Sequence, residues 1–397
     1  MPKLEGSFIL VTIAGVAVIL LVFFAPFFLK STYHTSSSTD SLGEPWATSI
    51  LPQIIPVTHL GTPEPLKALY MTSCVASNQN WRENLKTLIE TTELNAVVID
   101  IKDYTGVVSF PRLPAPEAAG NGGQAKGCVV HDMKEFIGEL HDEGIYVIGR
   151  ISVFQDPSYT RLFPELAVKR MSDGEVWKDY KGLSFIDVGA RPYWDYIVAL
   201  SETAYELGFD ELNYDYVRYP SDGNIKDTLY TWALGTTTKS KMLESFFEYL
   251  HDNLEDTGAK LSVDLFGMTT TVENDMNIGQ MLELALPYFD YVSPMVYPSH
   301  YPATWNGFVN PAEHPYEVVK LALSRGMERE ELLNILNGLA TSTPSKLRPW
   351  LQDFNLGATY GSDKVRAQIQ ATYDVGLTSW MLWNAGNKYT ESALLPE

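Results

Sequence analysis

Basic residues are scarce in this chain. Its 397 residues include 29 Lys and Arg against 49 Asp and Glu, which gives a formal net charge of −20. A surface with that charge repels phosphate backbones, so the composition argues against a nucleic-acid-binding protein. The apolar content of 45% is nonetheless sufficient for a large folded core.

Motifs for metal binding and for serine nucleophiles are also missing. None of the seven His forms a closely spaced pair at the end of an expected strand, which disfavours a metal-dependent hydrolase. The chain has no Gly-x-Ser-x-Gly nucleophile elbow. Gly120-Asn-Gly-Gly123 lacks the preceding strand and following helix of a phosphate-binding loop. We therefore expect no cofactor and no metal.

Cysteine is almost absent. Cys74 and Cys128 each follow an expected strand, so both are predicted at the same end of the fold. A disulfide between them requires an oxidising compartment. The sequence leaves open whether they are bridged or remain two inert thiols.

Charge is missing altogether from residues 7–29. This apolar run exceeds the ~20 residues that a transmembrane helix needs, whereas a cleaved signal peptide has an apolar run of about 7–15 residues. We predict an uncleaved signal anchor in residues 1–30, and hence a single-pass protein of the cell membrane with its catalytic domain outside the cytoplasm. Residues 31–65 are rich in Ser, Thr and Pro and are predicted to form a linker.

Strand-like runs alternate with amphipathic helices through the rest of the chain, which predicts a (β/α)8 TIM barrel over residues 66–397. A doubly wound open sheet is the competing architecture. A helical stretch near residues 328–339 interrupts the rhythm, the last helix is missing or atypical, and insertions are expected at residues 111–127 and 158–189. The eight expected strands lie at residues 66–71, 96–101, 146–154, 209–220, 261–268, 291–297, 347–354 and 378–384.

The fourth strand carries the strongest functional signal. Glu211, Asn213 and Asp215 alternate with apolar residues, so they share one face of the strand. A carboxylate on the inward face of a buried strand is costly unless it is paired or functional. Catalytic residues of TIM barrels lie at the C-terminal ends of the strands, and we therefore place Asp215 at the centre of an active site.

Other expected strand ends are also polar and aromatic, as in sugar-binding sites with two catalytic carboxyl groups. The partner of Asp215 is expected to be Asp264, with Asp353 or Asp103 as alternatives. Arg218 is expected to reach across the mouth to fix a carboxylate, and Tyr297 to supply a hydroxyl group. The residues expected to hold the sugar are Trp350, Gln352, Trp383 and Asn384.

Four segments together resemble a bacterial family described as a "putative glycosyl hydrolase domain". They are Val98-Ile-Asp-Ile-Lys-Asp103, Tyr214-Asp-Tyr-Val-Arg-Tyr-Pro220, Arg348-Pro-Trp-Leu-Gln-Asp-Phe354 and Trp380-Met-Leu-Trp-Asn384. The resemblance covers nearly the whole span from residue 66 to residue 389. It implies a barrel with a carbohydrate-cleaving role.

A more distant similarity, to chitinase-type glycoside hydrolases, is incomplete. Val217 occupies the position of their acid glutamate, and Pro298 replaces an aspartate after Tyr297. These two losses argue against a substrate-assisted mechanism. The first hypothesis is a membrane-anchored glycoside hydrolase acting on a cell-surface or extracellular polysaccharide. The alternative is a non-catalytic carbohydrate-binding barrel that tethers wall or capsule polymer.

Overall fold

The computed structural model describes residues 57–111, 128–232, 237–340 and 344–396. The expected membrane anchor lies outside these ranges, as does most of the linker. Within the described ranges, no helix has the length and apolar character needed to cross a bilayer.

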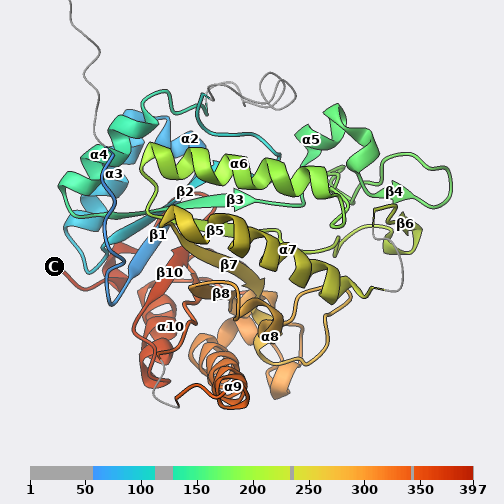
Figure 1. Ribbon diagram of the computed structural model, residues 1–397. Helices are drawn as coiled ribbons and strands as arrows, with labels where there is room; N and C mark the ends of the chain where they lie inside the picture. Colours follow the sequence, from blue (N-terminus) through green and yellow to red (C-terminus); the bar gives the residue numbers. More distant parts are fainter. Residues whose placement is uncertain (1–56, 112–127, 233–236, 341–343, 397) are drawn as a thin grey trace, which may run out of the picture. The chain divides into compact units, whose positions relative to one another are not determined.

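Eight parallel strands close into a barrel, in the order β1-β10-β9-β8-β7-β5-β3-β2 (Figure 1). All eight expected strands are present, so the closed barrel is confirmed over the open sheet. The strands are β1 (Lys67–Met71), β2 (Ala96–Lys102), β3 (Tyr146–Ser152), β5 (Glu211–Asp215), β7 (Lys260–Phe266), β8 (Tyr291–Met295), β9 (Trp350–Gln352) and β10 (Trp380–Trp383).

Strand β5 illustrates how the sequence directs side chains in this barrel. Leu212 and Tyr214 belong to the main apolar core, and the Tyr214 hydroxyl lies 2.9 Å from Ser201 Oγ in α6 (Arg191–Leu207). The alternate residues of β5 point into the barrel, where they bond to side chains of other strands. The alternation expected from the sequence is therefore confirmed.

Helices cover the outside of the barrel, with α6 and α7 side by side across one flank (Figure 1). One expectation is wrong: residues 328–336 continue α9 and do not form a separate helix. The last strand is followed by a short 3-10 helix, η8 (Glu391–Ala393), as an atypical last unit. The main outer helices are α3 (Gln79–Glu90), α4 (Met133–Asp142), α6, α7 (Lys239–Leu254), α8 (Leu282–Ala285), α9 (Pro315–Leu336) and α10 (Ser362–Asp374).

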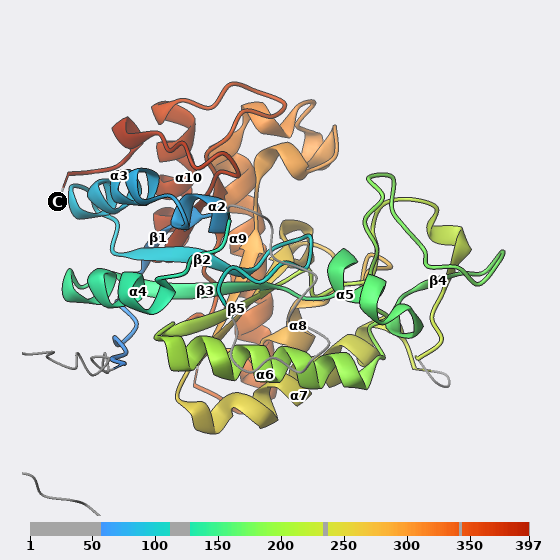
Figure 2. The same ribbon diagram turned by 90° about the horizontal axis from the view of Figure 1, so that it is seen from above.

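The insertion after β3 forms a small lobe beyond the C-terminal ends of the strands (Figure 2). It contains α5 (Pro157–Leu162) and β4 (Lys169–Arg170), which pairs antiparallel with β6 (Thr228–Leu229). Val168, Trp177 and Phe185 give the lobe its own apolar core. Most of the other expected insertion, residues 112–127, lies outside the described ranges.

The last residues of the expected linker pack under the opposite end of the barrel. The Leu60 amide donates a 2.7 Å hydrogen bond to Asp210, immediately before β5. Thr62 Oγ1 lies 3.0 Å from the hydroxyl of Tyr146, the first residue of β3. The His59 ring stacks on Tyr205 at 3.9 Å. These residues therefore belong to the folded unit and cover the N-terminal ends of the strands.

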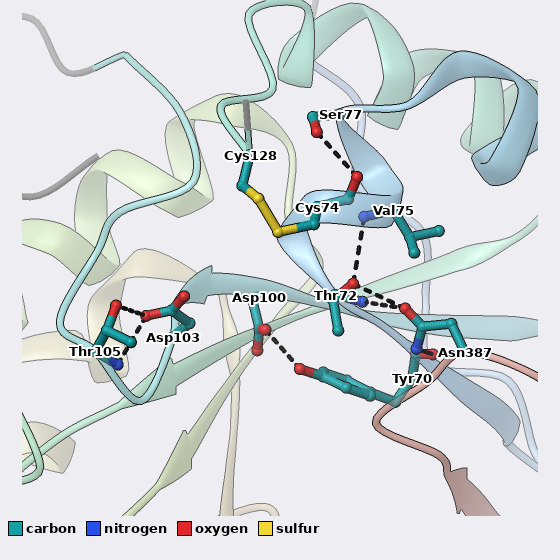
Figure 3. Close-up of a disulfide and its surroundings, with 10 residues drawn as sticks. All are labelled: Tyr70, Thr72, Cys74, Val75, Ser77, Asp100, Asp103, Thr105, Cys128 and Asn387. Carbon is teal, nitrogen blue, oxygen red and sulfur yellow. Dashed lines mark hydrogen bonds between the residues drawn. A yellow bond between two sulfur atoms is a disulfide. The ribbon is translucent and has the colours of Figure 1, made fainter. Parts of the chain in front are cut away.

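Cys74 and Cys128 form a disulfide, which resolves the alternative that the sequence left open (Figure 3). Cys74 lies in α2 (Ser73–Ala76), directly after β1. The bond joins this helix to the chain that follows residues 112–127, at the C-terminal end of the barrel.

Candidate active site

A cavity of about 340 Å³ opens at the C-terminal ends of the strands. Its wall combines two arginines and two aspartates with aromatic and methionine side chains. The lining residues are Arg150, Asp215, Tyr216, Arg218, Asp264, Phe266, Gly267, Met268, Met295, Tyr297, His300, Tyr301 and Trp383.

Four neighbouring strands contribute a continuous polar chain beside this cavity. The Tyr70 hydroxyl in β1 donates a 2.6 Å hydrogen bond to Asp100 in β2 (Figure 3). Arg150 in β3 then bridges two carboxylates, at 2.6 Å from Asp100 and 2.5 Å from Asp215 in β5. Burial raises the pKa of Asp100 to about 6, although Arg150 opposes that effect. The guanidinium therefore holds Asp215 from the side opposite to β7.

Asp264 in β7 is the second aspartate of the cavity wall. It is 1% exposed, and its Oδ1 accepts hydrogen bonds from Asn213 Nδ2 at 2.9 Å and Trp350 Nε1 at 2.8 Å. No hydrogen bond from the described part of the chain reaches Oδ2. Burial raises the pKa of Asp264 to about 8, and the charge of Asp215 acts in the same direction.

The pairing of β5 with β7 explains why the two carboxyl groups are close. Asn213 pairs with Ser262 and Tyr214 with Val263, so Asp215 and Asp264 are the next residues of the two neighbouring strands. Their environments differ, because Asp215 has a salt bridge to Arg150 and Asp264 has only neutral donors. Two carboxyl groups in such different environments can serve as an acid and a base or nucleophile in one reaction.

The backbone bends sharply at Tyr216. Its φ of 53° lies in the left-handed region, which is uncommon for a bulky residue. The Tyr216 amide donates a 2.5 Å hydrogen bond to Oδ1 of Asp215. Such conformations concentrate at functional sites. The bend fixes the carboxylate and turns the following residues out of the strand register.

Tyr297 lies in the cavity wall with a buried hydroxyl that has no hydrogen-bond partner among the described residues. Burial raises its pKa, and the charges of Asp264 and Asp215 add to the effect. A buried polar group without a partner is costly in a folded protein. Its position beside both aspartates makes this hydroxyl available to a bound ligand.

Trp383 provides the aromatic surface that the sequence predicted near the cavity. It is half-buried and stacks on Tyr70, with ring centroids 4.0 Å apart and planes at 14°. The Arg150 guanidinium lies 4.9 Å from its ring centre. Trp383 is therefore held rigidly while part of its surface remains accessible.

Gly267 keeps the cavity floor close-packed. A Cβ atom at this position would lie 2.5 Å from the backbone oxygen of Met295 and 2.7 Å from the Tyr301 hydroxyl. The contact with the Met295 backbone is too short for any larger residue, so glycine allows the turn after β7 to approach β8 at the wall of the site.

Two of the expected catalytic aspartates lie outside this cavity. Asp353 accepts hydrogen bonds from Thr390 at both carboxylate oxygens, at 2.8 Å from the amide and 2.6 Å from the hydroxyl. Asp103 accepts from the Thr105 amide and hydroxyl and stabilises the turn after β2 (Figure 3). Both aspartates serve local structure here, and the structure brings neither to the Asp215–Asp264 pair.

Three residues expected to hold sugar also have structural partners. Trp350 is fully buried and supports Asp264, so it offers no accessible face. Gln352 is fully buried and bonds to the backbone of Ser299 and Phe354. Asn384 donates to the backbone oxygens of Asp353 and Lys388. The structure places none of the three in the cavity wall.

Arg218 lies in the wall but does not have the expected partner. Within the described ranges it forms no ion pair, and Arg150 instead fixes Asp215. Arg150 was not among the residues predicted for the site from the sequence. Its inward position on β3, level with Asp100 on β2 and with Asn213 on β5, was the signal for this role.

The described residues contain no group of three or more His, Cys, Asp or Glu arranged to hold a metal ion.

Comparison with known proteins identifies the fold and the family of this chain. A search among curated protein sequences gave no match. A hypothetical protein from Ruminiclostridium thermocellum is 31% identical, with a TM-score of 0.44, over 49% of this chain and 96% of that one. The PgaB (BpsB) glycoside hydrolase domain from Bordetella bronchiseptica has a TM-score of 0.57 at 12% identity, covering 81% and 94% of the two chains. That likeness supports the barrel fold.

A structure titled as the C-terminal domain of a putative chitinase from Desulfitobacterium hafniense has a TM-score of 0.49 at 13% identity, over 83% of this chain and 96% of that one. The family model described as "Putative glycosyl hydrolase domain" matches residues 68–389, which include every strand of the barrel except the first residue of β1. The chain belongs to this family of putative glycosidases.

Proposed function

We propose that this protein hydrolyses O-glycosidic bonds of a cell-surface or extracellular polysaccharide, with Asp264 and Asp215 as the catalytic carboxyl groups. The observation that carries the proposal is their arrangement. They occupy neighbouring strands of the cavity wall, and only Asp215 has a salt bridge to a guanidinium.

Asp264 acts as the general acid. Because its pKa is raised to about 8, it carries a proton at neutral pH. Asn213 and Trp350 occupy Oδ1 and leave Oδ2 to hold that proton. Protonation of the leaving-group oxygen then weakens the glycosidic bond as positive charge develops on the sugar ring.

Asp215 acts as the second carboxylate, either as nucleophile or as the base that activates water. Arg150 and the Tyr216 amide hold its two oxygens in place. The Trp383 ring provides a stacking surface for a sugar, and the Tyr297 hydroxyl offers a hydrogen bond. A retained anomeric configuration in the product would indicate the nucleophile, and an inverted one the base.

The proposal includes a membrane-anchored domain outside the cytoplasm. Residues 7–29 carry no charge and are long enough for a spanning helix. The disulfide between Cys74 and Cys128 suits an oxidising compartment. A polysaccharide of the cell surface is the substrate class that fits this location.

The test measures release of reducing ends from fractionated wall or capsule glycan by the wild type and by Asp215→Asn and Asp264→Asn. Each variant should lose about 10²–10⁴-fold in rate, the range for removal of an acid or base. Asp103→Asn is the matched control, because it makes the same chemical change at a strand end outside the cavity. No cleavage by the wild type, with retained glycan binding, would support the carbohydrate-binding barrel instead.

A further inference from the structure

Arg218 is a buried cation without an anionic partner in the described structure. It is 9% exposed and lines the cavity. Its one hydrogen bond within the described ranges runs from Nη1 to the Tyr219 carbonyl oxygen at 3.1 Å. Nε and Nη2 donate to none of the described residues. Every other cation of the cavity wall is already neutralised, since Arg150 contacts both Asp100 and Asp215.

Aromatic rings surround the Arg218 guanidinium. Its centre lies 5.0 Å from the ring centres of Tyr216 and Phe266 and 5.7 Å from that of Phe185. Phe185 comes from the lobe after β3, and Phe266 from the end of β7. Ring faces stabilise a cation only in part, and a desolvated charge without a counter-ion remains costly. The arrangement keeps the position of the guanidinium fixed while its outer donors stay unused.

We propose that Arg218 forms a subsite for the carboxylate of an acidic sugar, so that the substrate is a uronic-acid-containing glycan. This inference rests on the proposed glycoside hydrolysis and names its substrate class. A planar guanidinium with two free donors matches a carboxylate in bidentate geometry, and burial among rings strengthens the interaction. The subsite also supplies local positive charge in a chain whose net charge of −20 would otherwise repel an acidic polymer.

The neighbouring groups support a role in binding the substrate and not in fixing the catalytic pair. Asp215 is already bonded to Arg150 and to the Tyr216 amide. Asp264 is held by Asn213 and Trp350. Arg218 is therefore free to engage a ligand beside the two carboxyl groups.

Binding is measured by isothermal titration calorimetry on the full-length protein in detergent, with methyl β-D-glucuronide and methyl β-D-glucoside as probes. The wild type should prefer the glucuronide by about tenfold or more, the contribution of one charge-assisted bidentate contact. Arg218→Gln should abolish this preference, and Arg218→Lys should retain part of it, because lysine keeps the charge without the planar fork.

Arg191→Gln is the matched control. Arg191 also packs on aromatic rings, at 4.1 Å from Trp194 and 4.9 Å from Tyr249, but it lies exposed on α6 outside the cavity. This variant should keep the wild-type preference. Thermal unfolding checks the fold of each variant, and Arg218→Gln should fold because it removes an uncompensated buried charge.

Equal binding of the two probes by the wild type, or no binding of either, would overturn the inference. So would an unchanged preference in Arg218→Gln. Tighter binding of methyl glucoside 6-phosphate than of the glucuronide would assign the subsite to phosphate and overturn the uronate assignment.

A cleavage assay separates this inference from the proposed function. An acidic wall glycan is compared with the same glycan after chemical reduction of its carboxyl groups to alcohols. The wild type should cleave the acidic form with a kcat/KM about tenfold or more above that for the reduced form, and Arg218→Gln should lose this difference. If the wild type cleaves the acidic and the reduced glycan at the same rate, the carboxylate subsite is contradicted but the hydrolase is not. Absence of any cleavage contradicts the hydrolase, while the calorimetric preference still decides the subsite.

Discussion

The Trp350 indole donates a 2.8 Å hydrogen bond from Nε1 to Oδ1 of Asp264, and the indole itself is fully buried. This buried tryptophan of β9 thus positions a carboxyl group and does not stack on a ligand. This bond favours the charged form of Asp264 and lowers its pKa, against the larger effect of burial.

Replacement Trp350→Phe removes the donor and keeps an aromatic ring. The pKa of Asp264 should rise further, so the alkaline limb of the pH–rate profile should move to higher pH. Loss of orientation should lower kcat by about tenfold, and the small cavity should cost about 1–3 kcal/mol of unfolding free energy. A pH profile of kcat and a denaturant titration test this. A lower rate with an unmoved alkaline limb would show that Trp350 acts through packing alone.

Cleavage should depend on pH through Asp264. The acid must carry its proton, which it does below its pKa of about 8 and loses as the pH rises above that value. We therefore expect kcat/KM to fall about tenfold per pH unit above pH ~8. The measurement is a profile of kcat/KM between pH 5 and 10. A rate that increases through pH 8 would exclude Asp264 as the acid.

Replacement Tyr297→Phe separates stability from function. The hydroxyl has no hydrogen-bond partner among the described residues, so its removal should leave the free energy of unfolding unchanged or slightly raised. Glycan cleavage should fall by about tenfold or more if the hydroxyl binds substrate beside Asp264 and Asp215. Denaturant titration and initial rates measure the two effects. A destabilised variant of full activity would show a purely structural role.

Replacement Asp353→Ala should lower the stability of the fold and leave the rate of glycan cleavage unchanged. It breaks the two hydrogen bonds to Thr390, which should cost about 1–3 kcal/mol of unfolding free energy. The rate of glycan cleavage should stay near the wild-type value at temperatures where the variant remains folded, because Asp353 lies outside the cavity. A loss comparable to that of Asp264→Asn would return Asp353 to the catalytic pair.

The barrel was predictable because its strands follow simple rules. Buried strands are apolar with period-two polar positions, and parallel neighbours bring their C-terminal ends together. These rules predicted Asp215 and Asp264 at the same end of two successive strands, and the structure has them on the paired strands β5 and β7. The full length of helix α9 was not predicted. The helix continues through Gly326, a residue that often marks the end of a helix in a sequence.

The details of the site could not be predicted from the sequence, because they depend on how deep each side chain lies in the barrel and on the turns after the strands. Trp350 and Trp383 were both predicted to hold the sugar, but Trp350 begins β9 and is fully buried, whereas Trp383 ends β10 and reaches the cavity. Arg218 follows the left-handed Tyr216, so strand alternation no longer fixes its direction. The spacing of residues in a sequence predicts on which face of a strand a side chain lies, but it does not predict how deep in the barrel that side chain is.

The packing of residues 59–62 beneath β3 and β5 also has a consequence for the proposed membrane tether. The chain enters the barrel at one pole, and the cavity with Asp215 and Asp264 opens at the other. In the proposed membrane-anchored hydrolase, attachment and glycan access would therefore use different surfaces, and a longer linker would extend the reach of the domain without changing the entrance of the cavity.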